Sequence, residues 1–248
     1  MTEAMLDVQD LYKIHGGSGE DHPVLRGVTF RVEPGEFVCI MGPSGSGKTT
    51  LLHLLSGLDE PSAGQVHLGG VDLTHAGERR RTVVRRDQVG YVFQFFHLMP
   101  NLTVEENIGL PLAIAGRSVK SQSGRITELA KTLGIEERLG ALPHELSGGE
   151  MQRASIARAL IGGQPLLLCD EPTGNLSQAA GREVMEELRR ACDDEGRTVV
   201  LVTHSPRDAT FADRVLLLVD GEMRAEEELR GPGLTEDDIH AALNRASI

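Results

Sequence analysis

The sequence predicts an α/β fold with a β-rich N-terminal region and a helical insertion. Three observations predict it. The first third of the chain contains short β-type segments separated by Gly, Pro and Asp. In the last third, apolar strand-like runs alternate with helix-like segments, and a polar helical stretch lies between the two parts. A chain of 248 residues is long enough to form one large domain with its own core.

The composition disfavours several classes of protein. Asp and Glu number 37 against 25 Lys and Arg, so the formal charge is −12, which disfavours a protein whose main partner is nucleic acid. A hydrophobic content of 40% disfavours a disordered chain. No segment has the apolar length of a membrane span, and the acidic N-terminus lacks a signal-peptide pattern. We therefore expect a cytoplasmic protein that reaches a membrane only through a partner. Its cysteines, Cys39, Cys169 and Cys192, are expected to be buried free thiols.

The N-terminal part is expected to contain strands at residues 5–14, 24–32 and 65–73. Residues 37–41 form a short apolar run that leads directly into a glycine-rich loop, a pattern typical of a buried parallel strand that feeds a helix. The helix after that loop has apolar residues at helical spacing and is expected to end near Gly57.

The middle of the chain is polar and helical, and β/α alternation then resumes. Thr235 stands three residues before Asp238, which predicts a capped start for a short terminal helix. The expected organisation is a single domain in three parts: a nucleotide-binding core with its β subdomain at 1–94 and 153–228, a helical subdomain at 95–152, and a helical tail at 229–248.

The glycine-rich loop predicts a phosphate-binding site. It fits the pattern G-x-x-x-x-G-K-[ST], follows a strand and opens a helix. Glycines let backbone N–H groups converge on one oxyanion, and the helix N-terminus adds the positive end of its dipole. The Lys48 ammonium is suited to the β- and γ-phosphates, and the Thr49 hydroxyl to Mg²⁺. The predicted nucleotide-binding residues are Gly42, Pro43, Ser44, Gly45, Ser46, Gly47, Lys48, Thr49 and Thr50.

Two acids follow the apolar run at residues 166–169. A buried strand would deliver Asp170 and Glu171 to the carboxyl edge of the sheet, where ligands of open α/β sheets bind. We expect Asp170 to hold Mg²⁺ through water. Glu171, one residue further on, projects to the other side of the strand and would polarise an attacking water.

Residues 146–153, Leu-Ser-Gly-Gly-Glu-Met-Gln-Arg, closely resemble the signature motif of ATP-binding-cassette (ABC) ATPases. The resemblance extends from Leu6 to about Met223 and includes five motifs in the family's order. The flanking sequence is most similar to the subgroup of lipoprotein-release, macrolide-efflux and cell-division systems. This resemblance implies a P-loop NTPase with a RecA-like core, an N-terminal antiparallel β subdomain and a helical insertion subdomain.

The signature itself predicts a second anion site, because Ser147 and two glycines precede a helical run. The resemblance implies that two cassettes pair head to tail as a homodimer, and that each signature loop contacts the ATP bound by the other copy. The implied contact residues are Ser147, Gly148, Gly149 and Glu150.

Three further positions match the family. The resemblance implies that Tyr12 stacks on adenine, that Gln94 contacts Mg²⁺ or the attacking water, and that His204 contacts the γ-phosphate. Residues 95–99 after Gln94 are aromatic and apolar; they either pack under the helical insertion or form a partly exposed patch. In the family, a coupling helix of the transmembrane permease docks near Gln94–Met99. The arginines around position 80 are expected to form a solvated helix face, with acidic lipid as the alternative partner.

The chain departs from the subgroup pattern at Ser177, where an interface aspartate is usual, and at Ser205, where an acid is common. We expect ATP hydrolysis that drives a membrane permease, for export or extraction of a hydrophobic or lipid-linked substrate or a peptide. The alternative within the family is a mechanical or signalling complex of the cell-division type. Chromosome-repair and translation ATPases are disfavoured, because this chain has a compact insertion and one cassette.

Overall fold

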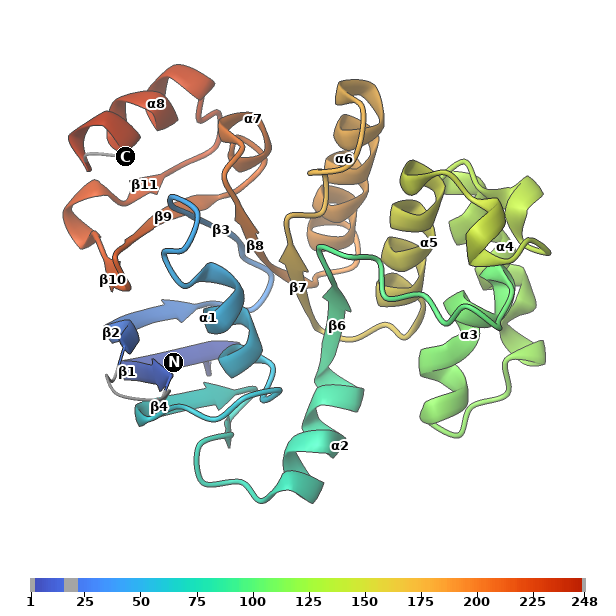
Figure 1. Ribbon diagram of the computed structural model, residues 1–248, viewed down its shortest axis with the longest axis horizontal. Coiled ribbons are helices and arrows are strands. Elements are labelled where there is room, and N and C mark those ends of the chain that lie inside the picture. Colours follow the sequence, from blue (N-terminus) through green and yellow to red (C-terminus); the bar gives the residue numbers. More distant parts are fainter. Residues whose placement is uncertain (1–2, 16–21, 247–248) are drawn as a thin grey trace.

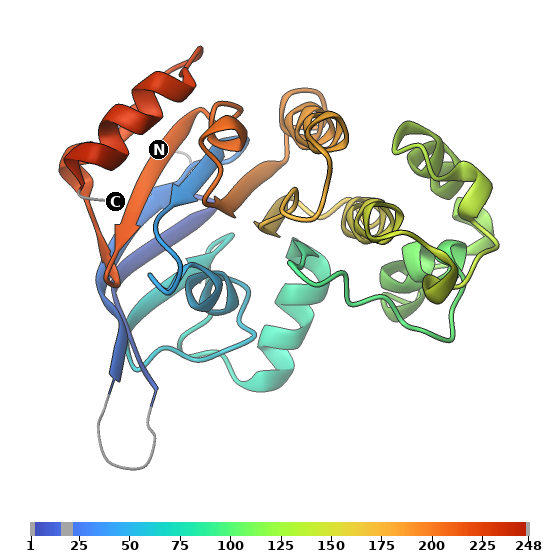
Figure 2. The same ribbon diagram turned by 45° about the horizontal axis from the view of Figure 1, so that its top comes forward.

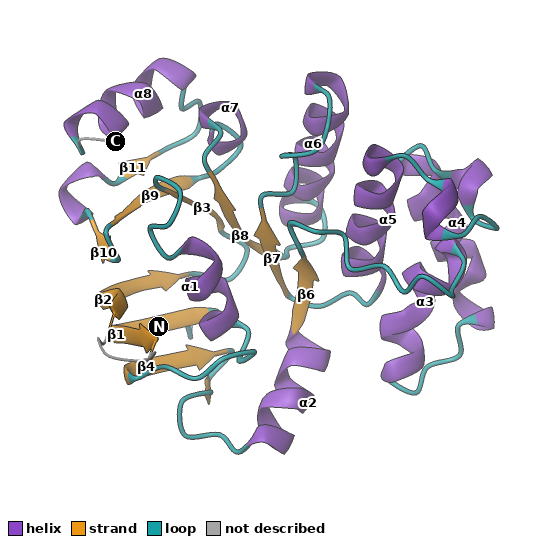
Figure 3. Ribbon diagram, in the orientation of Figure 1, coloured by secondary structure: helices purple, strands orange, loops and turns teal. Residues whose placement is uncertain are grey.

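A computed structural model describes residues 3–15 and 22–246 and shows two sheets with helices around them (Figures 1 and 3). The described strands of the first sheet run antiparallel in the order β2-β1-β4-β5. They are β1 (Leu6–His15), β2 (His22–Val32), β4 (Ala63–Leu68) and β5 (Val71–Asp72). The antiparallel β subdomain is thus confirmed.

The second sheet has the order β10-β9-β3-β8-β7-β6, and β11 also pairs with β9. Neighbours from β9 through β6 are parallel, as expected for a RecA-like core. The strands are β3 (Phe37–Met41), β6 (Val89–Val92), β7 (Leu166–Asp170), β8 (Thr198–Thr203), β9 (Arg214–Val219), β10 (Glu222–Met223) and β11 (Leu229–Arg230).

The helices follow the predicted alternation. They are α1 (Lys48–Leu55), α2 (Glu78–Gln88), α3 (Val104–Ile114), α4 (Ser123–Thr132), α5 (Gly148–Ile161), α6 (Gln178–Asp193), α7 (Pro206–Ala209) and α8 (Glu236–Arg245). Short 3₁₀ turns lie at η1 (Lys120–Gln122), η2 (Glu136–Arg138), η3 (Pro143–Glu145) and η4 (Ala225–Glu227). Within the described ranges, no helix is long and apolar enough to cross a membrane.

The central strands are buried on both faces, so they separate two cores. Alternate side chains of β3 point to opposite sides: Cys39 and Met41 join the core beneath α3, α5 and α6, whereas Val38 and Ile40 join the core shared by α1 and the antiparallel sheet. This two-sided burial explains why the strand sequences are continuous apolar runs. All three cysteines are buried free thiols, as expected.

The helical part lies beside β6 and β7, away from the antiparallel sheet (Figure 2). Its expected end at residue 152 falls inside α5, a continuous helix over Gly148–Ile161. That helix begins at the signature motif and ends against the core, so it connects the two parts. The tail also differs from the expectation, because it begins with β11, paired to β9, before α8.

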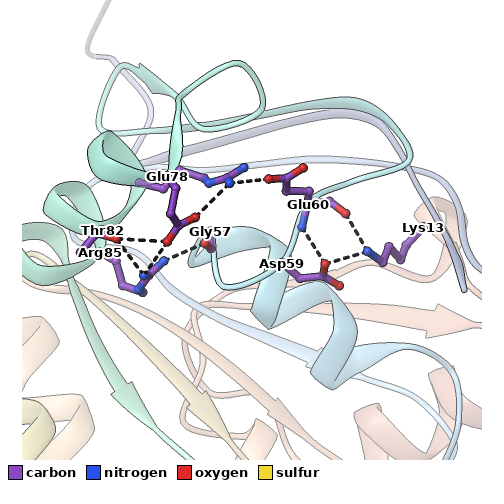
Figure 4. A network of polar contacts seen from close by, with 8 residues as sticks. Lys13, Gly57, Asp59, Glu60, Glu78, Thr82 and Arg85 are labelled. Atoms are coloured by element: carbon purple, nitrogen blue, oxygen red, sulfur yellow. Dashed lines mark hydrogen bonds and ion pairs between the residues drawn. The ribbon is translucent and has the colours of Figure 1, made fainter.

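Helix α2 corrects the expectation of a solvated arginine face. Arg79 and Arg80 are exposed, but Arg81 is buried and forms ion pairs with Glu60 and with Glu78 at 3.0 Å. The Arg85 guanidinium donates to the Gly57 carbonyl at 2.7 Å, as Figure 4 shows. These side chains fix α2 to the loop after α1, since α2 itself buries little apolar surface.

Candidate functional site

The phosphate loop connects β3 to α1, and its glycines are required by its path. A Cβ on Gly42 would lie 2.0 Å from the Leu218 carbonyl oxygen, so no larger residue fits there. Gly47 has a φ of +100°, and a Cβ on it would lie 2.8 Å from the Leu25 side chain. The loop therefore turns sharply into the N-terminus of α1, which presents its free N–H groups to the same space.

A cavity of about 320 Å³ lies at this turn. Its lining residues come from β2, the phosphate loop, α1 and the ends of β6 and β7: Val24, Ser44, Gly45, Gly47, Lys48, Thr49, Thr50, Gln94, Asp170 and Glu171. The Lys48 ammonium donates to the Gly42 and Pro43 carbonyls at 2.8 and 2.9 Å. Burial lowers the pKa of Lys48, and the carboxylates of Glu171 and Asp170 oppose that shift.

The loop contains a buried hydroxyl without a partner. Ser46 is 3% exposed, and its Oγ forms no hydrogen bond among the described residues. Ser46 is not among the residues that line the cavity, and its Oγ lies beside Gly42. The groups that fit the phosphates of a nucleotide are the Lys48 ammonium and the free N–H groups at the start of α1, which line the cavity.

Asp170 ends β7 opposite α1. The Thr49 hydroxyl donates to Asp170 Oδ1 at 3.3 Å, so two hard oxygen donors face each other. Burial raises the pKa of Asp170, and the neighbouring Glu171 charge adds to the rise. A cation between the hydroxyl and the carboxylate would offset both effects. Since these two oxygens do not complete an octahedral shell, Mg²⁺ there would take its other ligands from phosphate and water.

Glu171 follows Asp170 at the same edge of the sheet, on the side of β8. Its Oε1 lies 2.8 Å from His204 Nδ1, and its Oε2 accepts a hydrogen bond from the Thr203 hydroxyl at 3.1 Å. The Glu171 N–H donates to the Val202 carbonyl at 2.9 Å, which holds the backbone of this residue at a φ of +46°. Asp170 and Glu171 thus have different partners: Asp170 faces Thr49, and Glu171 faces Thr203 and His204. The sequence reasoning missed Thr203, although it directly precedes His204.

The signature residues form the predicted helix start but do not line this cavity. Ser147 caps α5, with its Oγ accepting from the Glu150 N–H at 3.3 Å and its own N–H donating to Glu150 Oε2 at 2.8 Å. Gly148 and Gly149 form the first turn of that helix. Gln152 joins the helix to the loop after Glu171 by donating to the Pro172 carbonyl at 2.9 Å.

Tyr12 lies on β1 with 37% of its surface exposed and does not line the cavity around Lys48. Gln94 does line it. The residues after Gln94 divide between the two alternatives: Phe95 is 69% exposed, whereas Leu98 packs against the core.

The sequence reasoning missed two side chains that hold this segment. Arg158 of α5 donates to the Phe96 and His97 carbonyls at 2.8 and 2.6 Å. The Asn107 side chain is fully buried in α3. Its amide oxygen accepts from the Met99 N–H, and its amide nitrogen donates to the Met99 carbonyl.

An apolar groove of about 370 Å³ opens beside this segment, between α2, β6, α3 and α5. Phe93 lies in it and stacks on Tyr91, with ring centroids 4.1 Å apart. Ile114, on its rim, is 63% exposed. This groove was not predictable from the sequence, because its walls come from four separate segments.

Known proteins are similar to this chain in sequence and in fold. The ABC transporter family profile matches residues 25–174. The lipoprotein-releasing system ATP-binding protein LolD 2 of Caulobacter vibrioides is 43% identical over 226 residues, 91% of this chain and 99% of that protein. The macrolide export ATP-binding/permease protein MacB of Syntrophobacter fumaroxidans is 39% identical across 98% of this chain, which matches 36% of that longer protein.

The solved structures agree. The cassette MJ0796 of Methanocaldococcus jannaschii, in a dimeric post-hydrolysis state bound to ADP and Pi, superposes with a TM-score of 0.88 at 37% identity. The superposition covers 93% of this chain and 100% of that one. By sequence and by fold the chain belongs to the ABC transporter family, and it is an ATP-hydrolysing cassette of that family.

Proposed function

We propose that this chain is the ATP-binding subunit of a transporter and hydrolyses ATP to drive a separate membrane permease. The observation that carries the proposal is the position of Glu171, which lies at the edge of the phosphate cavity and is held by His204 and Thr203. A carboxylate in that position can orient water toward a phosphate bound at Lys48.

Each residue of the cavity has one proposed role. The loop N–H groups and Lys48 bind the β- and γ-phosphates, and Thr49 and Asp170 hold Mg²⁺, which neutralises charge on the phosphates. Glu171 accepts the proton of the attacking water, while His204 fixes the orientation of that carboxylate and contacts the γ-phosphate. Gln94, which follows β6, contacts Mg²⁺ or the attacking water, and Tyr12 stacks on the adenine.

A second copy completes the site. Ser147 lies outside the cavity formed by its own chain, so the signature loop is proposed to contact ATP bound by a second copy. The dimeric cassette structures of MJ0796 support this arrangement. Two nucleotides would then lie between two copies related by a two-fold axis.

The permease is proposed to dock on the apolar groove and on residues 94–99, which places the chain on the inner face of the cell membrane. Exposed apolar side chains are typical of interaction sites: Ile114, which lines the groove, is 63% exposed, and Phe95, in the 94–99 segment, is 69% exposed. The similarity to LolD and MacB proteins favours export or extraction of a lipid-linked or hydrophobic substrate.

The test is a reconstitution of the chain with candidate permeases from the same genome. Phosphate release with MgATP should rise when the permease is added in lipid vesicles, and Lys48→Ala should release no phosphate. Ile114→Asp should lower the stimulation by the permease, because a carboxylate would enter the apolar groove. Equal stimulation of parent and Ile114→Asp would exclude docking at this groove, and a chain without phosphate release would contradict the ATPase function.

A further inference from the structure

The signature turn carries a negative charge where the proposed function places a phosphate. Glu150 is the third residue of α5, and its carboxylate folds back onto Ser147. Its Oε2 accepts hydrogen bonds from the Ser147 N–H at 2.8 Å and from the Ser147 hydroxyl at 2.7 Å. The hydroxyl proton that a phosphate would receive is therefore directed at Glu150.

The carboxylate is ionised at neutral pH. The Ser147 N–H and hydroxyl, together with Arg138, lower the pKa of Glu150 to about 2. An anion beside a phosphate site weakens binding of the phosphate, because neighbouring negative charges repel each other, and they repel more strongly where an interface excludes water. A glutamine would form the same capping box without that charge. Glu150 thus stabilises the helix start and opposes the binding of an anion to it.

Arg138 offsets this charge. It ends η2, 12 residues before Glu150, and its Nε donates to Glu150 Oε1 at 2.7 Å. The two oxygens of the carboxylate are divided, one for Ser147 and one for Arg138. The Glu150 side chain is 17% exposed and the Arg138 side chain 51% exposed, so the ion pair lies at the surface, where added salt screens it.

We propose that Arg138 is a positioning residue of the signature site: it neutralises and orients Glu150, so that the Ser147 turn can accept the γ-phosphate of ATP bound to a second copy. This proposal rests on the proposed function of Ser147. It predicts that the contribution of Arg138 to pairing depends on the charge of Glu150.

The experiment measures ATP-dependent dimerisation of the full chain by analytical ultracentrifugation, with Glu171→Gln in every protein to slow hydrolysis. Arg138→Gln should raise the dimer dissociation constant about 5-fold or more, because an uncompensated charge then faces the phosphate. The deficit should shrink at high salt. The double variant Arg138→Gln/Glu150→Gln should return to within about twofold of Glu150→Gln alone, since no charge is left to neutralise.

The matched control is Arg245→Gln on α8. Arg245 Nε donates to Glu227 at 2.6 Å, and the two side chains are 55% and 20% exposed. Arg245→Gln therefore removes a similar ion pair that lies far along the chain from the signature. Dimerisation of this control should equal that of the parent. Thermal unfolding of the isolated variants separates a loss of fold from a loss of pairing.

Two results overturn the proposal. A deficit in Arg138→Gln that persists beside Glu150→Gln would mean that Arg138 acts on the fold or on phosphate directly, and an unchanged dissociation constant would remove Arg138 from the site. Ser147→Arg distinguishes the proposed function itself: if that variant still forms an ATP-dependent dimer, the shared site is wrong and the role of Arg138 fails with it. If Ser147→Arg blocks pairing while Glu150→Gln does not remove the pairing deficit of Arg138→Gln, only the present proposal fails.

Discussion

Asn107 is the side chain whose replacement should most disturb the segment after Gln94. It is fully buried in α3 and forms four hydrogen bonds. Its Oδ1 accepts from the Met99 N–H at 2.7 Å, and its Nδ2 donates to the carbonyls of Met99, Leu102 and Thr103 at 3.1, 2.9 and 3.0 Å. One amide thus fixes the turn that contains Pro100.

Asn107→Leu keeps the approximate size of the side chain but removes all four bonds. The Met99 and Thr103 carbonyls retain other donors, the N–H groups of Leu102 and of residue 107 itself. The Met99 N–H and the Leu102 carbonyl lose their partners, and each buried orphan costs about 1–3 kcal/mol. Met99 is 46% exposed, so water reaches part of this turn. We therefore expect the free energy of unfolding to fall by about 2–4 kcal/mol.

For a domain of this size, that loss corresponds to a Tm lower by about 4–16 °C. Circular dichroism melts without nucleotide measure it, and amide exchange should accelerate at residues 99–103. Asn101→Leu is the control, because Asn101 is exposed on the same turn and should change stability by less than about 0.5 kcal/mol. An Asn107→Leu protein that melts within the error of Asn101→Leu would refute the assignment of these hydrogen bonds as a stabilising network.

The other predictions concern turnover. Glu171→Gln keeps the shape of the side chain without its charge, so phosphate release should fall about 10²–10⁴-fold while ATP still binds; hydrolysis at the parent rate would remove Glu171 from the mechanism. Lys48→Ala should abolish nucleotide binding and Ser147→Arg should block turnover, yet mixing the two should restore some phosphate release, because one composite site per mixed dimer is intact. No rescue, with mixed dimers verified by crosslinking, would argue against shared sites. Ser177 caps α6 by accepting from the Ala180 N–H at 3.4 Å, a bond that aspartate can also accept. Ser177→Asp should therefore keep the helix and reach half-maximal specific activity at a lower protein concentration, and superimposable activity curves would show that the serine does not weaken pairing.

Local features of the fold were predictable from the sequence because neighbouring residues determine them. The turn from β3 into α1 needs glycine at Gly42 and Gly47, and the spacing of the motif specifies both. The caps at Ser147 and Thr235 use a side chain three residues away, so four letters suffice to predict them. The strands that are buried on both faces are continuous apolar runs, which made the parallel core predictable.

Contacts between distant segments were not predictable in this way. Burial of Arg81 depends on Glu60, 21 residues earlier, and a run of arginines by itself indicates only a solvated face. The expected end of the helical part at residue 152 lies within α5, and a helix that starts in one part and ends in another shows no break in its sequence. The resemblance implied roles for Tyr12, Gln94 and His204, and those roles remain predictions.

The sequence by itself determined which residues can bind phosphate, because the glycines, the lysine and the hydroxyl are neighbours in one short loop whose backbone path they set. Only the tertiary structure decided which side chains hold the rest of the site in place. Arg158 reaches the carbonyls of Phe96 and His97 across about sixty positions of the chain, and Thr203 reaches Glu171 across 32. The physical reason is that a hydrogen bond between distant residues depends on the path of the whole chain, whereas a cap or a tight turn depends on a few adjacent backbone angles.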